Sequence, residues 1–186
     1  MIRLLLPTIF AALATATPAP QPLVPIALHP GVNPVRDMAG DGENGSIALD
    51  WRENGNAWGY HIYTVTLGGS VATIGGEDHL RDSPHTGEDM ITAVRFARGS
   101  HGGHATTFAL VATRKIGEAV PDPAPTNITL YALTANDSGI GTPYAFEPVR
   151  EVKARRPYCN ADMALLVELG LPLAADYDGS RSPDGC

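Results

Sequence analysis

Short stretches of alternating or β-branched apolar residues, separated by Gly, Pro and Asn, run from residue 46 to residue 154. Strands spaced by about ten residues with turn residues between them are typical of all-β folds. The stretches are SIALDWRE, AWGYHIYTVTL, SVATIG, EDMITAVRFAR, HATTFALVATRK, TNITLYALT and PYAFEPVREVKA. EDMITAVRFAR is ambiguous, because four of its residues also suit one face of a helix: Met90, Ala93, Val94 and Ala97.

One helix is predicted near the C-terminus, at about residues 160–169, in CNADMALLVELGLP. Asn160 is a favourable N-cap, and Asp162 places negative charge in the first turn, where the helix dipole stabilises it. Gly170 ends the helix. The expected apolar stripe consists of Met163, Leu166, Val167 and Leu169. The predicted fold class is therefore mainly β, an antiparallel β-sandwich or barrel-like domain with one C-terminal α-helix.

The N-terminus has the features of a secretory signal peptide over residues 1–16. A positive start at Arg3 precedes the apolar run LLLPTIFAALA, and a small-x-small cleavage signal ends at Ala16. We therefore expect a periplasmic or secreted protein. Residues 17–34 carry six prolines and are expected to form an extended leader over the surface, ordered only near Val32. Residues 35–186 are expected to form a single mainly β domain.

The chain has two cysteines, Cys159 and Cys186. An even number of cysteines in an exported chain favours a disulfide. A bridge between them would close a loop of about 27 residues and contribute about 3 to 4 kcal/mol. The alternative is a buried Cys159 and a free thiol at the terminus.

The charge of the chain argues against two classes of partner. The formal net charge is −7, and the eleven arginines and two lysines do not form a long basic run. Nucleic-acid binders carry a basic patch, and peripheral membrane proteins carry a basic amphipathic segment. We expect neither nucleic acid as a partner nor membrane insertion after signal cleavage.

The segment WRENGNAWGY contains a polar cluster with two possible interpretations. Asn54-Gly55 favours a tight hairpin turn, in which case Arg52 and Glu53 end one strand and Ala57 begins the next. Alternatively, the cluster lines a groove for a polar or anionic ligand, because a planar guanidinium binds a carboxylate through two donors. The ligand-binding candidates are Arg52, Glu53, Asn54, Asn56 and Tyr60.

No sequence motif supports catalysis. The chain contains no G-x-S-x-G, S-x-x-K, H-E-x-x-H or C-x-x-C motif, and no catalytic residue is predicted. His101 and His104 in SHGGH are weak metal-ligand candidates, since imidazoles at this spacing can share a zinc or copper ion. The other interpretation is an exposed turn between two strands. No cofactor is expected, and the protein is more consistent with a non-enzyme.

Three blocks, in order, resemble those of a known family. GVNPVRDMAGDGENGSIALDWRENGNA resembles a D-x-x-G-D-G motif followed by a strand and R-E-N-x-N-A-H. YALTANDSGIGTPYAFE resembles Y-x-L-x-x-N-x-x-G-x-G-x-P-x-Y-x-F, and KARRPYCNADMALLVELG resembles A-x-x-x-Y-C-D-V-x-x-A-x-x-x-E-L. Together, over residues 31 to about 170, they resemble the CarG-type carbapenem self-resistance family, whose members are exported to the periplasm.

The resemblance implies a non-enzymatic role in intrinsic carbapenem resistance, by binding or protection rather than by hydrolysis. A carbapenem carries a carboxylate, which makes Arg52 the first candidate for contact with a small anionic ligand. One alternative is a structural or protein-interaction module that binds another envelope protein. Another is a metal-dependent hydrolase that uses the loop of His101 and His104.

Overall fold

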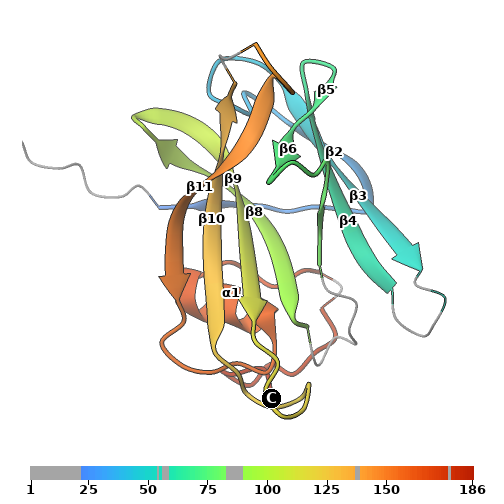
Figure 1. The fold of residues 1–186 in the computed structure, drawn as a ribbon, viewed down its shortest axis with the longest axis vertical. Coiled ribbons are helices and arrows are strands. Elements are labelled where there is room, and N and C mark those ends of the chain that lie inside the picture. Colours follow the sequence, from blue (N-terminus) through green and yellow to red (C-terminus); the bar gives the residue numbers. More distant parts are fainter. Residues whose placement is uncertain (1–21, 54, 56–58, 83–89, 137–138, 176) are drawn as a thin grey trace, which may run out of the picture.

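The computed structural model describes residues 22–53, 55, 59–82, 90–136, 139–175 and 177–186. Within these ranges the chain is mainly β with one helix near the C-terminus, as predicted (Figure 1). The elements, in chain order, are β1 (Val24–Ile26), β2 (Gly31–Val35), β3 (Gly45–Glu53), β4 (Gly59–Leu67), β5 (Ser70–Val71), β6 (Thr73–Ile74), β7 (Leu80–Arg81), β8 (Thr92–His101), β9 (His104–Arg114), β10 (Thr126–Ala135), β11 (Tyr144–Lys153) and α1 (Ala161–Leu169).

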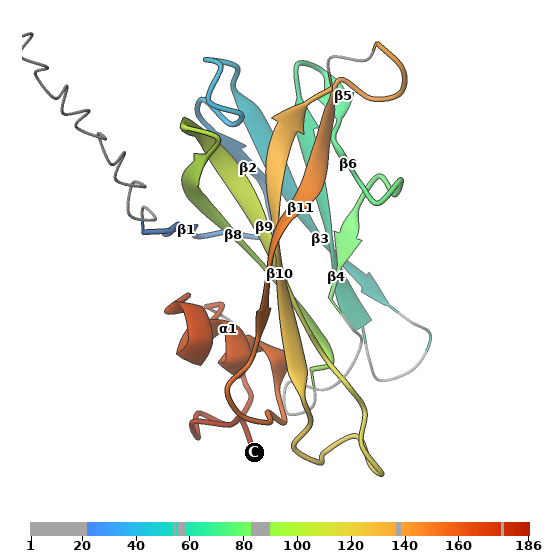
Figure 2. The ribbon, with the colours of Figure 1, turned by 60° about the vertical axis from the view of Figure 1, so that its left-hand side comes forward.

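The strands form two separate sheets, which is the sandwich alternative of the predicted fold class. Sheet A has the order β1-β8-β9-β10-β11-β6, and its long strands β8 to β11 are consecutive antiparallel neighbours. Sheet B has the order β2-β3-β4-β5, with β7 also paired to β4. In Figure 2, α1, sheet A and sheet B follow one another as three layers, with sheet A in the middle.

Sheet A is buried on both faces, and each face has its own apolar core. Toward sheet B it presents residues such as Val94 and Phe96, which pack with Ile47 and Val65. Toward α1 it presents a second set, which packs with the helix. This second set consists of Ala93, Ala97, Phe108, Leu110, Ala112, Ile128, Leu130 and Ala132. Burial on both faces removes the polar alternation of a surface strand, which explains why EDMITAVRFAR also resembled a helix.

Helix α1 begins and ends where its capping residues predict. The Asn160 side-chain oxygen accepts a hydrogen bond of 2.8 Å from the backbone N–H of Asp162. Gly170 has a left-handed backbone with φ 71°, and its N–H donates to the Leu166 carbonyl at 2.8 Å. Leu165, which lay outside the predicted stripe, is fully buried against sheet A, whereas Leu166 is only partly buried. No helix in the described parts of the chain is long and apolar enough to cross a membrane.

The C-terminal segment is covalently attached to the start of α1. Cys159 and Cys186 form the expected disulfide, with their Cα atoms 5.1 Å apart. Contacts other than the disulfide hold this segment as well. The backbone N–H of Cys159 donates to the Asp184 carbonyl at 2.9 Å, and Tyr177 packs against the core beneath α1.

Several local expectations differ from the structure. The proline-rich stretch, expected to be a surface leader, contributes β1 to sheet A and β2 to sheet B. SVATIG forms two short strands in different sheets rather than one, because β5 continues the hairpin of β4 whereas β6 pairs with β11. These strands are short or proline-containing, so their sequences carry little periodicity.

Candidate functional site

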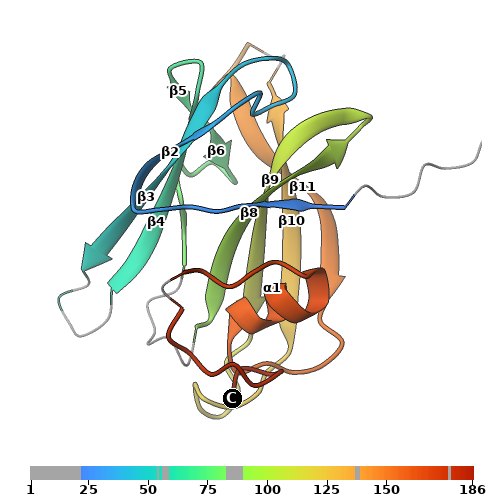
Figure 3. The ribbon, with the colours of Figure 1, turned by 180° about the vertical axis from the view of Figure 1, so that it is seen from behind.

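The end of the β3–β4 hairpin extends past sheet A (Figures 1 and 3), and the described residues of the polar cluster, Arg52, Glu53 and Tyr60, belong to this end. Among the described residues, the two strands are paired as far as Glu53 and Gly59. Of the predicted Asn54-Gly55 turn the structure describes only Gly55, which has a positive φ of 67°. Asn54 and Asn56 lie outside the described residues.

Arg52 and Tyr60 are cross-strand partners, so their side chains lie on the same face of sheet B. This face is the outer one, opposite the core. Arg81 in β7 joins them, with its guanidinium carbon 5.9 Å from the centre of the Tyr60 ring. Both arginines are exposed. We call Arg52, Tyr60 and Arg81 the arginine face; Asp50 is exposed on the same side, two residues before Arg52.

Glu53 lies on the opposite, inner face of the hairpin, because successive side chains of a strand alternate. On that face Trp51 is the cross-strand partner of His61, and their rings meet edge to face at 5.1 Å and 68°. The indole also lies over Gly59, where a Cβ atom would come within 1.9 Å of its Cζ2 atom. Trp51 therefore needs a glycine at position 59 in order to lie against β4.

Asp82 fixes the orientation of His61 from behind. Asp82 is 4% exposed, and its carboxylate accepts a hydrogen bond of 2.7 Å from the backbone N–H of His61 and one of 3.3 Å from the Tyr63 hydroxyl. The His61 Nδ1 atom lies 2.9 Å from the same carboxylate. An ionised carboxylate only accepts hydrogen bonds, so Nδ1 carries a proton.

The pKa of the Tyr63 hydroxyl is raised, first by burial and then by the negative charge of Asp82. Arg95 partly opposes this shift. Arg95 also forms an ion pair of 2.5 Å with Asp162 in the first turn of α1. Tyr63 is thereby kept neutral at physiological pH and acts as a hydrogen-bond donor to Asp82.

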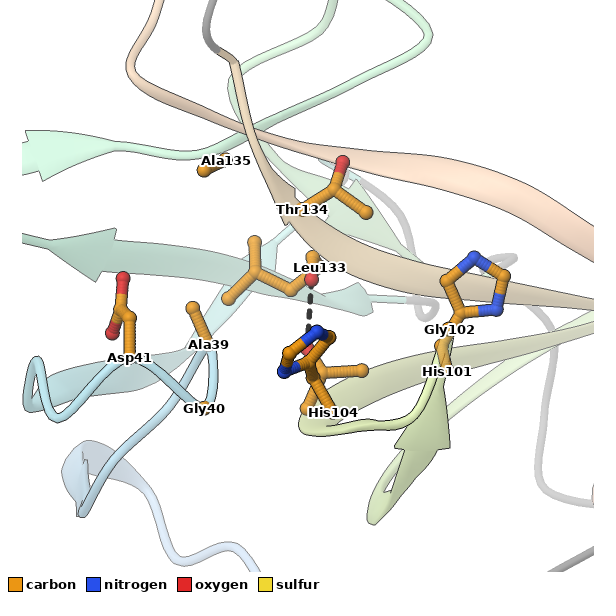
Figure 4. A pocket seen from close by; sticks show the side chains of 10 residues that line it. Ala39, Gly40, Asp41, His101, Gly102, His104, Leu133, Thr134 and Ala135 are labelled. Carbon is orange, nitrogen blue, oxygen red and sulfur yellow. Dashed lines mark hydrogen bonds between the residues drawn. The ribbon is translucent and has the colours of Figure 1, made fainter.

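The two histidines of SHGGH flank a tight turn at the opposite end of the molecule. Gly102 and Gly103 both have positive φ, 60° and 85°, which allows a two-residue hairpin, and His101 is the cross-strand partner of His104. They border a hollow of about 370 Å³ that also includes Asp41 and Leu133 (Figure 4).

This hollow does not gather its polar groups at one point. In Figure 4 the two imidazole rings and the Asp41 carboxylate lie apart around it. Asp41 instead accepts a hydrogen bond of 3.0 Å from the Tyr144 hydroxyl. Across the residues that the structure describes, no three His, Cys, Asp or Glu side chains are close enough to hold a metal ion.

The structure therefore brings together part of the predicted ligand-binding set and adds residues that sequence reasoning missed. Arg52 and Tyr60 are neighbours, whereas Glu53 lies on the other face. Arg81 and Asp82 were not predicted. In the sequence they are only a basic and an acidic residue directly after Leu80. Nothing in that pattern indicates that this segment pairs with β4.

The chain has the same fold as one protein of known structure. No family model matches the sequence, and no curated protein matches it. The crystal structure of CarG superimposes with a TM-score of 0.61 and 21% sequence identity, covering 76% of this chain and 93% of that chain. At this identity the likeness establishes a CarG-like fold, which confirms the sequence resemblance at the level of the fold.

Proposed function

We propose that this protein is an exported, non-catalytic binding protein that contributes to carbapenem resistance by binding the drug at the arginine face. Two observations support the general role: the three sequence blocks that resemble the carbapenem self-resistance family, and the CarG-like fold. The signal-peptide features support export, and the disulfide is compatible with an oxidising compartment.

The placement of Arg52 and Arg81 beside Tyr60 carries the proposal. A guanidinium can donate hydrogen bonds to both oxygens of a carboxylate. Two neighbouring guanidinium groups give an anion two such donors. Tyr60 between them supplies an apolar ring and a hydroxyl, as ligand sites commonly combine. A carbapenem presents the matching chemistry, a carboxylate on a small bicyclic ring.

Isothermal titration calorimetry with a carbapenem tests this assignment. We expect saturable binding to the purified protein, weakened about tenfold by Arg52→Ala or by Arg81→Ala, because each change removes a charge-assisted contact. Arg181→Ala is the matched control: Arg181 also lies over a tyrosine ring, 6.0 Å from the centre of the Tyr177 ring, and Tyr177 packs against the core between α1 and sheet A rather than on sheet B. Its affinity should equal that of the unchanged protein.

Equal affinity of the Arg52→Ala and Arg81→Ala variants and the unchanged protein would contradict the arginine face as the site. The proposal that the protein does not hydrolyse the drug has a separate readout, the β-lactam absorbance of the drug during incubation with excess protein. We expect this absorbance to persist as it does in buffer. A faster loss of absorbance with the protein would show that the β-lactam ring is opened and would contradict a non-catalytic role.

A further inference from the structure

The inner face of the β3–β4 hairpin carries an exposed aromatic ring that the arginine face does not use. Trp51 is 57% exposed, although Ile47 and Val65 on the same face are buried in the core. The difference arises because the end of the hairpin runs away from sheet A, as the views from front and back both show (Figures 1 and 3). A large exposed aromatic side chain is a recurrent feature of binding surfaces.

This indole is held in place without any ligand. Its six-membered ring lies over Gly59, and the centre of the His61 ring is 5.1 Å from that of the indole, in an edge-to-face arrangement. His61 is in turn fixed by the buried carboxylate of Asp82. A ring that is already ordered loses little conformational entropy when a ligand binds to it, so its orientation favours binding.

Glu53 supplies a negative charge next to the ring. It is the cross-strand partner of Gly59, the residue that the indole covers, so Glu53 and the ring lie on the same face of the hairpin. Glu53 is exposed. The arginines of the arginine face point to the other side of the sheet, because their strand positions alternate with those of Trp51 and Glu53.

We propose that Trp51 and Glu53 form a second binding site, which takes an organic ammonium ion. The face of an indole attracts cations more strongly than the other aromatic side chains do. An adjacent carboxylate adds a counter-charge, and the net charge of −7 favours approach of a cation. This site differs from the proposed drug site in both its face of the sheet and the charge of its ligand.

Choline and 3,3-dimethyl-1-butanol are suitable probes, because they have nearly the same shape and differ in charge. The chain has two tryptophans, so a Trp58→Phe background leaves Trp51 as the single indole emitter. Titration of its fluorescence should show saturable binding of choline with a Kd of about 1 mM. Binding of the neutral alcohol should be weaker by about fivefold or more.

Four variants distinguish this site from a general apolar surface. Glu53→Gln should weaken choline binding about threefold to tenfold, because it removes the counter-charge while keeping the shape. Gly59→Ala should abolish binding although Trp51 and Glu53 remain, since the new Cβ displaces the indole. Trp51→Ala, followed by calorimetry, should also abolish it. Arg52→Ala on the other face should leave choline binding unchanged.

Equal binding of choline and the neutral alcohol would overturn the proposal and indicate an apolar-ring site instead. No response to choline up to about 50 mM would also overturn it. Because the carbapenem titration depends on Arg52 and Arg81, and this titration on Trp51 and Glu53, either proposal can fail without the other. Far-ultraviolet circular dichroism of each variant confirms that it is folded.

Discussion

Asp82 is the residue on which the candidate site most depends. It is almost fully buried, and its carboxylate accepts hydrogen bonds from the backbone and ring of His61 and from the Tyr63 hydroxyl. A buried carboxylate that satisfies several donors also fixes their positions. Asp82 thus joins β7 to β4 and orients the imidazole against which Trp51 rests.

Asp82→Asn should lower the free energy of unfolding by about 1 to 3 kcal/mol, because an amide cannot accept all of these hydrogen bonds. Urea unfolding measures this loss. Near-ultraviolet circular dichroism should change as well, since Trp51 loses its fixed neighbour. Asp78→Asn is the matched control, because Asp78 also contacts a histidine, His79, at 2.6 Å, but is exposed.

The control variant should unfold at the same urea concentration as the unchanged protein, because an exposed pair of this kind is screened by solvent. Equal stability of Asp82→Asn and the unchanged protein would show that Asp82 does not anchor β7.

Among the elements, helix α1 was the easiest to predict from the sequence, and the β3–β4 hairpin was the hardest to interpret. The caps of α1 are local signals, since Asn160 and Gly170 act through hydrogen bonds within one turn. The hairpin depends on register, which sets the face on which each side chain lies. Arg52 and Glu53 are adjacent in the sequence and yet belong to opposite faces.

Asn160→Ala should lower the free energy of unfolding by about 1 kcal/mol, because the first turn of α1 loses its N-cap acceptor. Asn160→Ser should retain most of the stability, since its hydroxyl can accept the same hydrogen bond from Asp162. Thermal unfolding followed by circular dichroism measures both. Equal melting temperatures of the two variants would argue against the cap as the source of the effect.

For the molecule as a whole, sheet A is the central layer that holds the other two. One face packs against sheet B and the other against α1, so the apolar runs of β8 to β10 are buried on both sides. The C-terminal segment belongs to the α1 layer, because the Cys159–Cys186 disulfide joins it to the start of α1.

The double variant Cys159→Ser, Cys186→Ser should remain folded but lose about 3 to 4 kcal/mol of stability, because the unfolded chain is no longer constrained over this loop. Urea unfolding compares it with the oxidised protein. The oxidised protein with added reductant should approach the stability of the variant. An unchanged unfolding midpoint after complete reduction, checked by mass spectrometry, would contradict a stabilising role.

The sequence by itself determined the long strands other than β8, the capped helix and the favoured pairing of the two cysteines. These depend on residues close together in the chain, or on the only pairing that two cysteines allow. Tertiary structure alone decided that sheet A is buried on both faces and that Arg81 lies beside Tyr60. It also placed Asp82 behind His61. These features depend on strand register and on contacts between segments distant in sequence, which periodicity does not encode.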